Sequence, residues 1–442
     1  NYQTFSMASN QSVSPAPPTS GLVRVMGQWD LTALTVNGII GSAIFFLPAT
    51  IAGLMGPLSP YAYIVCALVT LTFILSFAEV SSRFSSAGGP YLYAYEAFGK
   101  FVGFEIGWIA YLTRLAAVAA NYNLFIIYLG HFFPSTTSGF LRASIVFVLI
   151  AGFALINIRG VKYGARTVDV ITIAKLLPLL LLILVGLFFI EGKNLAFNSL
   201  PPYEGFMRSM FLLSFAFGGF EIVTIPSAES VNPQRHVPRA LVSALLIAAG
   251  VYFLIQLVAV GSLPTLASQE RPIAAVATVI MGSLGGHIVA FGALVSTFGY
   301  FGGAILGVPR LTFALGEKKQ LPVFFSHIHS KFRTPDISIL IYSALAFLLA
   351  VFSNFITLAA ISVVSRLIYY ITTSASVLVF RKRGRAPFTL PMGAAIPLIG
   401  IAFAFYLLSY TKLEEVYFTL GGIAVGSIFY FTAKKVNARD ST

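Results

Sequence analysis

Runs of apolar residues, each about 20 residues long and separated by short polar segments, recur along most of the chain. A helix needs about 20 apolar residues to cross a hydrocarbon core ~30 Å thick. We therefore predict an all-α integral membrane protein with about twelve spans. The spans are residues 29–55, 59–82, 101–130, 141–158, 169–190, 206–228, 239–262, 287–313, 337–352, 355–379, 394–411 and 414–433.

Helix-weakening residues concentrate in the first and sixth spans. The first contains "NGIIGSAIFFLPATIAGLMG", and the sixth contains "FLLSFAFGGFEIVTIPSAES". Five spans separate the two, which favours two five-span repeats, residues 29–190 and 206–380, followed by two appended helices in 394–433. An odd number of spans turns the second repeat upside down relative to the first, a plan that many secondary transporters share. Close helix packing through small residues is the alternative explanation of the glycines.

An interruption of a helix at membrane depth leaves backbone amides and carbonyls that lipid cannot satisfy, so they must line a cavity within the protein. The amides at the start of the second half of the first span belong to Ser42, Ala43 and Ile44. They suit a carboxylate, because a helix N-terminus attracts negative charge. The carbonyls that suit an ammonium group lie near Ile39, Phe215 and Gly218. Together the two sets predict a site for a zwitterionic α-amino acid.

Composition and charge agree with a membrane protein. Hydrophobic residues make up 57% of the chain and charged residues only 10%, against roughly 25% charged residues in soluble domains. The net charge of +13 raises the possibility of nucleic-acid binding. With a cytoplasmic N-terminus, however, outer loops hold only Arg142, Lys193, Arg208, Arg271 and Lys412. The basic charge therefore records orientation, and no nucleic acid is expected as a partner.

Both termini are accordingly expected in the cytoplasm and the protein in the plasma (inner) membrane. Residues 1–28 are rich in Ser and Pro and predict a disordered cytoplasmic tail. Residues 434–442 form the C-terminal cytoplasmic tail. The single cysteine, Cys66, lies within the second span and is expected to be a core residue.

Ionisable residues inside spans are functional candidates by default. Lys175 is a candidate proton carrier or fixed cation, with a snorkelling anchor as the alternative. Glu221 follows the glycines of the sixth span. Arg114 and Arg366 are expected to be either functional or partners in buried ion pairs and backbone contacts. Structural pairing is the favoured role of the acidic residues near the cytoplasmic ends, Glu79 and Glu105.

No sequence feature indicates an enzyme, a metal or a cofactor. The chain has no Walker loop, no GxSxG element and no metal-spaced Cys/His cluster. The only close histidine pair, His327 and His329, lies in a basic cytoplasmic loop with no carboxylate or cysteine beside it. Among the many phenylalanines only Phe215, by its position relative to the glycines, is a candidate gate over the substrate.

Four segments make the chain resemble the amino acid–polyamine–organocation superfamily of permeases, within it the bacterial relatives of the L-amino acid transporters. They are "GIIGSAIFFLPATIAG", "FAEVSSRFSSAGGPYLYAYEAFGKFVGFEIGW", "GFEIVTIPSAESVNPQRHVPRAL" and "GVPRLTFALGEKKQLPVFFSHI". The resemblance extends from Gly27 to about Lys435. It implies a LeuT-type fold with substrate held between spans one, three, six, eight and ten.

The resemblance also assigns roles to single residues. The resemblance and the two helix interruptions together give one set of expected substrate-binding residues. They are Ile39, Gly41, Ser42, Ala43, Ile44, Asn121, Phe215, Gly218 and Gly219. The coupling or gating residues are Lys175, Glu221, Ser296 and Thr297. A lysine matching Lys175 takes the position that sodium fills in sodium-coupled relatives, and a hydroxyl of span eight is its expected partner.

Three departures from the family pattern affect these expectations. Ala43 stands where relatives have a second glycine, so its methyl group narrows the approach to the backbone. Phe215 replaces a tryptophan of some relatives and weakens any cation–π contact. The loop "HFFPSTTSGF" lacks the cysteine through which some relatives bind a glycoprotein heavy chain, so no disulfide-linked partner is expected.

The resulting hypothesis is a sodium-independent amino acid transporter, either a proton symporter or an exchanger (antiporter), that works by alternating access in the lipid bilayer. A polyamine or organic-amine carrier is the alternative, although such a carrier needs further carboxylates in its cavity besides Glu221. A channel or receptor is a remote alternative, because the polar groups concentrate at two interruptions instead of lining a continuous path.

Overall fold

The computed structural model describes residues 26–84, 88–160, 165–197, 199–224, 230–390 and 392–439. For residues 165–174 and 437–439 it describes the backbone alone. Residues 1–25 of the predicted N-terminal tail and 440–442 of the C-terminal tail lie outside these ranges. So does Glu229, which belongs to one of the four family segments.

Within the described residues every regular element is a helix. The α-helices are α1 Gln28–Ile39, α2 Ala43–Met55, α3 Ser59–Ser81, α4 Gly89–Phe98, α5 Lys100–Leu129, α6 Gly139–Ile158, α7 Ala165–Gly186, α8 Tyr203–Ala216, α9 Pro233–Ser262, α10 Pro272–Gly307, α11 Pro309–Glu317, α12 Asp336–Phe352, α13 Phe355–Arg381, α14 Ala395–Leu408 and α15 Leu413–Arg439. The 3₁₀-helices are η1 Gly56–Leu58, η2 Pro134–Thr137, η3 Leu187–Phe189, η4 Gly192–Leu195, η5 Phe220–Thr224, η7 Leu266–Ser268 and η8 Val323–Ser326. One isolated β-bridge joins Met26 to Ser230.

Eight helical stretches of the described residues are long and apolar enough to cross a membrane, and three shorter apolar helices accompany them. The prediction of an all-α multi-pass membrane protein is confirmed. Most helix boundaries lie within a few residues of the predicted spans, because polar or Gly/Pro residues separate the apolar runs.

Two features were not predicted. A short helix, α4, lies between the second and third spans. The helix predicted to begin at residue 287 begins instead at Pro272, and its first part is set off by Gly282, whose φ of 71° lies outside the helical region. Glycine adopts this left-handed conformation without the Cβ clash that other residues suffer.

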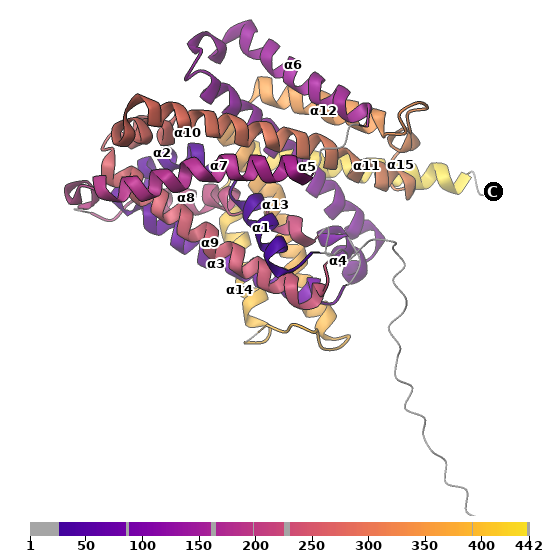
Figure 1. Ribbon diagram of the computed structural model, residues 1–442. Coiled ribbons are helices and arrows are strands. Elements are labelled where there is room, and N and C mark those ends of the chain that lie inside the picture. The colour runs from indigo at the N-terminus through magenta and orange to yellow at the C-terminus, as the bar shows by residue number, and fades with distance from the viewer. Residues whose placement is uncertain are drawn as a thin grey trace, which may run out of the picture.

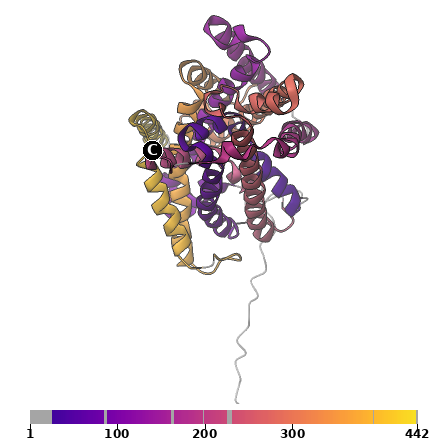
Figure 2. The same ribbon diagram turned by 90° about the vertical axis from the view of Figure 1, so that its left-hand side faces the viewer.

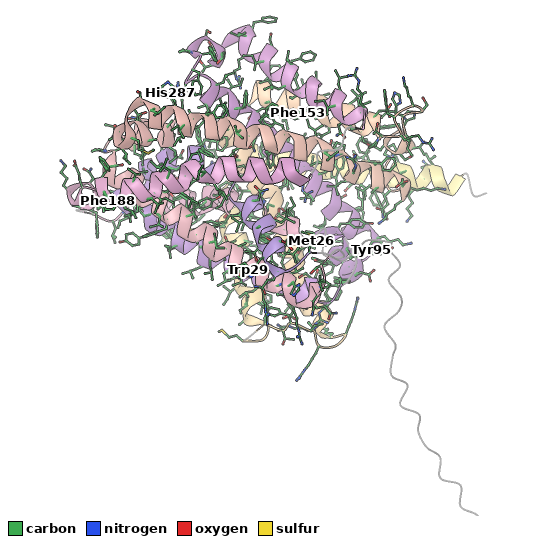
Figure 3. All side chains as sticks on the ribbon, in the orientation of Figure 1. Met26, Trp29, Tyr95, Phe153, Phe188 and His287 are labelled. Carbon is green, nitrogen blue, oxygen red and sulfur yellow. The ribbon has the colours of Figure 1, made fainter. Side chains whose placement is uncertain are left out.

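The helices form one bundle around α13. Helix α13 packs against α3, α5 and α8, and α10 packs against α5 and α7 (Figure 1). Helices α6 and α12 pack together at one edge, and α15 lies on the periphery (Figure 2). Phe188 of η3 and Tyr95 of α4 mark opposite ends of the bundle (Figure 3). The peripheral helices expose apolar side chains, for example Phe147 of α6 and Phe405 of α14, as lipid contact requires.

Three side chains confirm structural roles that were expected. Cys66 is only 1% exposed, so it belongs to the core and is not available for a disulfide with another chain. Glu79 of α3 accepts from Arg381 Nε of α13 at 2.7 Å and from the amide of Leu390 at 2.8 Å. Glu105 of α5 accepts from the Ser427 hydroxyl of α15 at 2.7 Å. Both carboxylates therefore join helices.

Candidate functional site

The first predicted interruption separates α1 from α2. Helix α1 ends at Ile39, helix α2 begins at Ala43, and residues 40–42 between them are bent. The first amides of a helix have no acceptor within that helix. Ser42, Ala43 and Ile44 lie at this N-terminus and are at most 5% exposed, so the residues that carry these amides are buried.

The second predicted interruption ends α8 at Ala216, and η5 follows from Phe220. Gly219 between them has a φ of 97°. It also meets the first interruption backbone to backbone: a Cβ on Gly38 would lie 2.8 Å from the Gly219 carbonyl oxygen, and a Cβ on Gly219 would overlap the Gly38 carbonyl. The glycines of the two spans therefore bring the two interruptions into direct contact.

Lys175 of α7 reaches the first interruption. Its Nζ donates to the carbonyl oxygens of Asn37 at 2.9 Å and Ile40 at 2.7 Å. The residue is 6% exposed, so the side chain does not extend to the surface as a snorkelling anchor would. A fixed ammonium group thus pairs with carbonyls that the end of α1 leaves without intrahelical donors.

Tyr252 of α9 links the two interruptions and was missed in the sequence. Its hydroxyl lies 2.7 Å from the Ile39 carbonyl oxygen and 3.1 Å from the Ala216 carbonyl oxygen. These acceptors end α1 and α8, so one phenol holds both helix ends. The apolar residues around Tyr252 in the sequence do not indicate this contact, because Tyr252 and Ile39 lie 213 residues apart in the chain.

Glu221 of η5 lies at the centre of a buried polar cluster. Its carboxylate accepts from the Tyr369 hydroxyl at 2.6 Å, the Tyr370 hydroxyl at 3.2 Å and the Gly219 amide at 3.0 Å. Arg366 of α13 approaches the same carboxylate, with Nε 3.8 Å from Oε1. Arg114 is close enough to interact electrostatically with Glu221. The adjacent tyrosines in "RLIYY", within an apolar span, were the available but unused signal.

Arg366 also contacts the interrupted end of α8. Its Nη1 lies 3.5 Å from the Ser214 carbonyl oxygen and 3.4 Å from the Phe215 carbonyl oxygen. The guanidinium carbon lies 5.9 Å from the centroid of the Phe215 ring. Of the roles expected for Arg366, the structure combines the buried ion pair and the backbone contact.

The remaining candidates lie on neighbouring helices. Asn121 of α5 is 3% exposed and donates to the Ala117 carbonyl of its own helix at 2.8 Å. Thr297 of α10 donates to carbonyls of its own helix, with Oγ1 3.0 Å from the Ala293 oxygen. Ser296 beside it is 6% exposed. The Phe215 ring lies edge-on to Phe355, with centroids 5.8 Å apart, so it packs beside the interruption.

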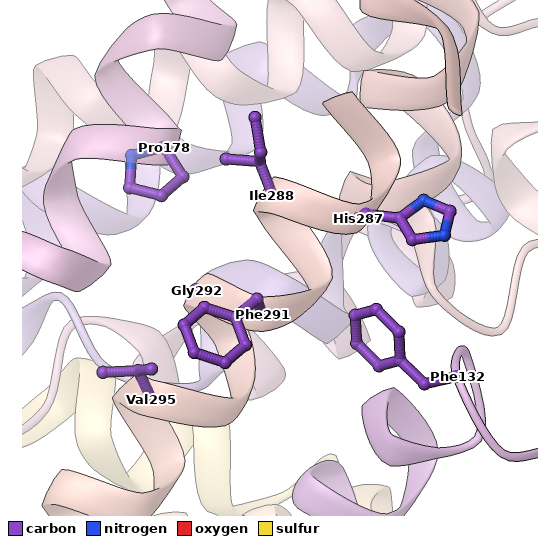
Figure 4. A pocket seen from close by; sticks show the side chains of 7 residues that line it. All are labelled: Phe132, Pro178, His287, Ile288, Phe291, Gly292 and Val295. Atoms are coloured by element: carbon purple, nitrogen blue, oxygen red, sulfur yellow. The ribbon is translucent and has the colours of Figure 1, made fainter. Parts of the chain in front are cut away.

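An apolar cleft of about 370 Å³ lies apart from these residues, against α7 and α10. Its lining residues are Phe132, Pro178, His287, Ile288, Phe291, Gly292 and Val295 (Figure 4). None of the candidate residues contributes to it. It also lacks the paired charges that a zwitterion needs, so the interruptions remain the candidate site.

The described residues contain no group of three or more His, Cys, Asp or Glu side chains that could hold a metal ion. One detail predicted for the pair of His327 and His329 was wrong. His327 does have a carboxylate beside it, since its Nδ1 lies 2.7 Å from Asp336 Oδ1. The loop turns back at residues 329–334, through a hydrogen bond from the His329 amide to the Thr334 carbonyl, and so returns Asp336 to the histidine.

Comparison with known proteins gives matches over nearly the whole chain. A sequence model described as "Amino acid permease" matches residues 26–431. The serine/threonine exchanger SteT of Bacillus subtilis is 30% identical, with 90% of this chain and 93% of the relative covered. The methylthioribose transporter of the same organism is 28% identical over 95% of each chain. Its branched-chain amino acid permease BcaP is 26% identical, with 95% of this chain and 96% of the relative covered.

Proposed function

The chain belongs to the amino acid permease family, and from this membership we propose that it is a sodium-independent secondary transporter of amino acids. The family and these relatives are transporters, so the prediction that the chain is not an enzyme is confirmed. Transport proceeds by alternating access, with proton symport or amino acid exchange as the coupling mode. The relatives named for serine, threonine and branched-chain amino acids support a neutral amino acid as substrate.

The substrate binds at the two helix interruptions in this proposal. Buried amides at Ser42, Ala43 and Ile44 receive the carboxylate, and the carbonyl ends of α1 and α8 receive the amino group. Gly41 and Gly219 allow the close approach of the backbones. Asn121 and Phe215 contact the substrate side chain, and Glu221, Ser296 and Thr297 take part in gating or coupling.

Lys175 is the observation that carries sodium independence. Its ammonium group is buried and bonded to the Asn37 and Ile40 carbonyls. Backbone carbonyl oxygens of interrupted helices are also the ligands that a sodium ion would use. Because a covalently attached cation already fills these carbonyls, no sodium ion is needed to stabilise the end of α1.

We extend the proposal to the architecture. Residues 29–190 and 206–380 form two repeats of opposite orientation, residues 394–433 form the appended pair, and the protein spans the plasma membrane with both termini in the cytoplasm. The matching positions of the interruptions, between α1 and α2 and between α8 and η5, support this arrangement.

Cationic substrates are disfavoured by the surroundings of Glu221. A polyamine carrier needs free carboxylates in its cavity. Glu221 already accepts three hydrogen bonds and lies beside Arg366. Among the described residues, the polyamine alternative therefore finds no unengaged carboxylate at the interruptions.

Purified protein in liposomes tests the proposal. We expect saturable uptake of at least one neutral amino acid, equal in sodium and choline buffers, and inhibition by leucine in preference to putrescine. The panel includes cationic amino acids, amines and methylthioribose. Loss of uptake without sodium would refute sodium independence, and a complete lack of uptake and exchange across the panel would refute amino acid transport.

A further inference from the structure

Arg366 occupies the place where the proposed function puts the substrate amino group. Its Nη1 points to the Ser214 and Phe215 carbonyls at the interrupted end of α8. A Cβ on Gly218 would overlap the guanidinium, so the missing side chain at this position makes room for the arginine. Phe215 and Gly218 are the positions expected to bind a substrate ammonium group.

The guanidinium is buried but weakly held. It carries five N–H donors, and its side chain is 9% exposed. The hydrogen bonds to the Ser214 and Phe215 oxygens are 3.5 and 3.4 Å long, beyond the usual range of 2.7–3.2 Å. Its Nε is buried and has no hydrogen-bond partner among the residues that the structure describes.

Glu221 balances the charge of Arg366 without fixing its position. The separation of 3.8 Å between Nε and Oε1 is that of an ion pair with no direct hydrogen bond. The carboxylate makes its shorter contacts with Tyr369, Tyr370 and Gly219, and Tyr369 also lies near the guanidinium. A small movement toward Glu221 would shorten the ion pair and free the carbonyls of α8.

We propose that Arg366 is a tethered substitute for the substrate amino group: it pairs with the α8 carbonyls when the site is empty and moves toward Glu221 when an amino acid binds. A guanidinium and an ammonium group are both cationic donors, so they compete for the same oxygens. This inference rests on the proposed function.

Two consequences follow. The competition lowers the apparent affinity for amino acids by the fraction of time that the arginine leaves the carbonyls free. It also keeps the Ser214 and Phe215 carbonyls of the empty site paired, so the empty carrier can close and reorient without leaving these two oxygens unsatisfied. Wild-type protein is therefore expected to catalyse net uptake into vesicles that contain no amino acid.

Binding of matched ligands to Arg366→Met tests the competition at equilibrium. The probes are L-leucine and L-serine, each compared with the same acid lacking the amino group, isocaproate and hydracrylate. If the arginine fills the carbonyl site nine-tenths of the time, its removal tightens binding of the amino acids about tenfold. The acids without an amino group do not gain, because they make no use of the freed carbonyls.

Two further variants are controls. Arg366→Lys retains a tethered cation and should keep the wild-type ratio of the two affinities. Arg142→Met removes another arginine that donates to backbone carbonyls, those of Ala350 and Val351. It lies away from the interruptions and should leave the ratio unchanged.

Unchanged or weaker amino acid binding by Arg366→Met, or an equal gain for both ligand types, would overturn the inference. Should this variant fail to fold, uptake by the wild-type protein into empty vesicles tests the inference instead. Uptake that strictly requires an amino acid inside the vesicles contradicts the role of Arg366 as a tethered substitute. The proposed function fails separately, if wild-type protein neither binds nor transports any amino acid.

Discussion

Lys175 shows how one side chain satisfies backbone carbonyls at a helix interruption. Its ammonium group has exchanged water for two carbonyl oxygens, those of Asn37 and Ile40. Burial of an ammonium group is tolerable only when such partners replace its hydration. The residue therefore ties α7 to the end of α1, and any motion of α1 must stretch or keep these two bonds.

Replacement of Lys175 by alanine is expected to reduce transport at least about tenfold, or to uncouple it from pH, while membrane expression is retained. The Asn37 and Ile40 carbonyls lose a charged donor, each such hydrogen bond being worth about 1.5–3 kcal/mol. Uptake at several pH values measures the effect. Lys193→Ala, in an exposed loop with 77% of its side chain accessible, is the control. Wild-type uptake and pH dependence in Lys175→Ala would contradict a coupling role.

Tyr252 makes a second prediction at this scale. Removal of its hydroxyl in Tyr252→Phe leaves the Ile39 and Ala216 carbonyls without this donor and should lower the free energy of unfolding by about 1 kcal/mol. Tyr63→Phe is a matched control, because the buried Tyr63 hydroxyl has no hydrogen-bond partner among the described residues. Denaturation in detergent compares the two. Equal stability of both variants would show that the Tyr252 hydroxyl does not hold the helix ends.

At the scale of elements, contact between the two interruptions depends on glycine. Helix α1 packs against η5 and α9, and Gly38 and Gly219 meet with no side chain between them. The sequence predicted two sites of helix weakening. The structure adds that each interruption is the surface against which the other packs.

Gly219→Ala should therefore destabilise the protein and reduce transport. Its φ of 97° disfavours a Cβ by about 1–2 kcal/mol, and overlap with the Gly38 carbonyl adds about 1–3 kcal/mol of overpacking. Gly53→Ala provides the comparison, since its Cβ would meet only the Ala267 Cβ at an ordinary 3.7 Å. Thermal denaturation and uptake report both effects. A Gly219→Ala protein as stable and active as Gly53→Ala would show that the contact is dispensable.

At the scale of the whole molecule, charge predicts the orientation in the membrane. Lys193 lies in a predicted outer loop and Lys331 in a predicted inner loop, and both are exposed. With Cys66 replaced by alanine, a membrane-impermeant maleimide should label Lys193→Cys in intact cells and Lys331→Cys only after permeabilisation. The opposite pattern would reverse the proposed topology.

The sequence alone determined most of the helices and two of the places where a helix breaks. Lipid accepts only helices and closed barrels, so apolar runs of about 20 residues left little freedom, and the Gly-rich stretches at 38–41 and 218–219 could be read directly. The short helix α4 was not predicted, because it lies in a connection between spans and has no apolar run long enough for a span.

Only the tertiary structure decided which backbone groups of the two breaks are already paired. Lys175 meets Asn37 across 138 residues, Tyr252 meets Ile39 across 213, and Arg366 meets Phe215 across 151. Hydropathy and local breaks give no information on such pairings, because each depends on how separate helices pack and on which side chain is long enough to reach. The sequence predicted a site rich in free carbonyls. The packing shows that the protein supplies its own donors to several of these carbonyls.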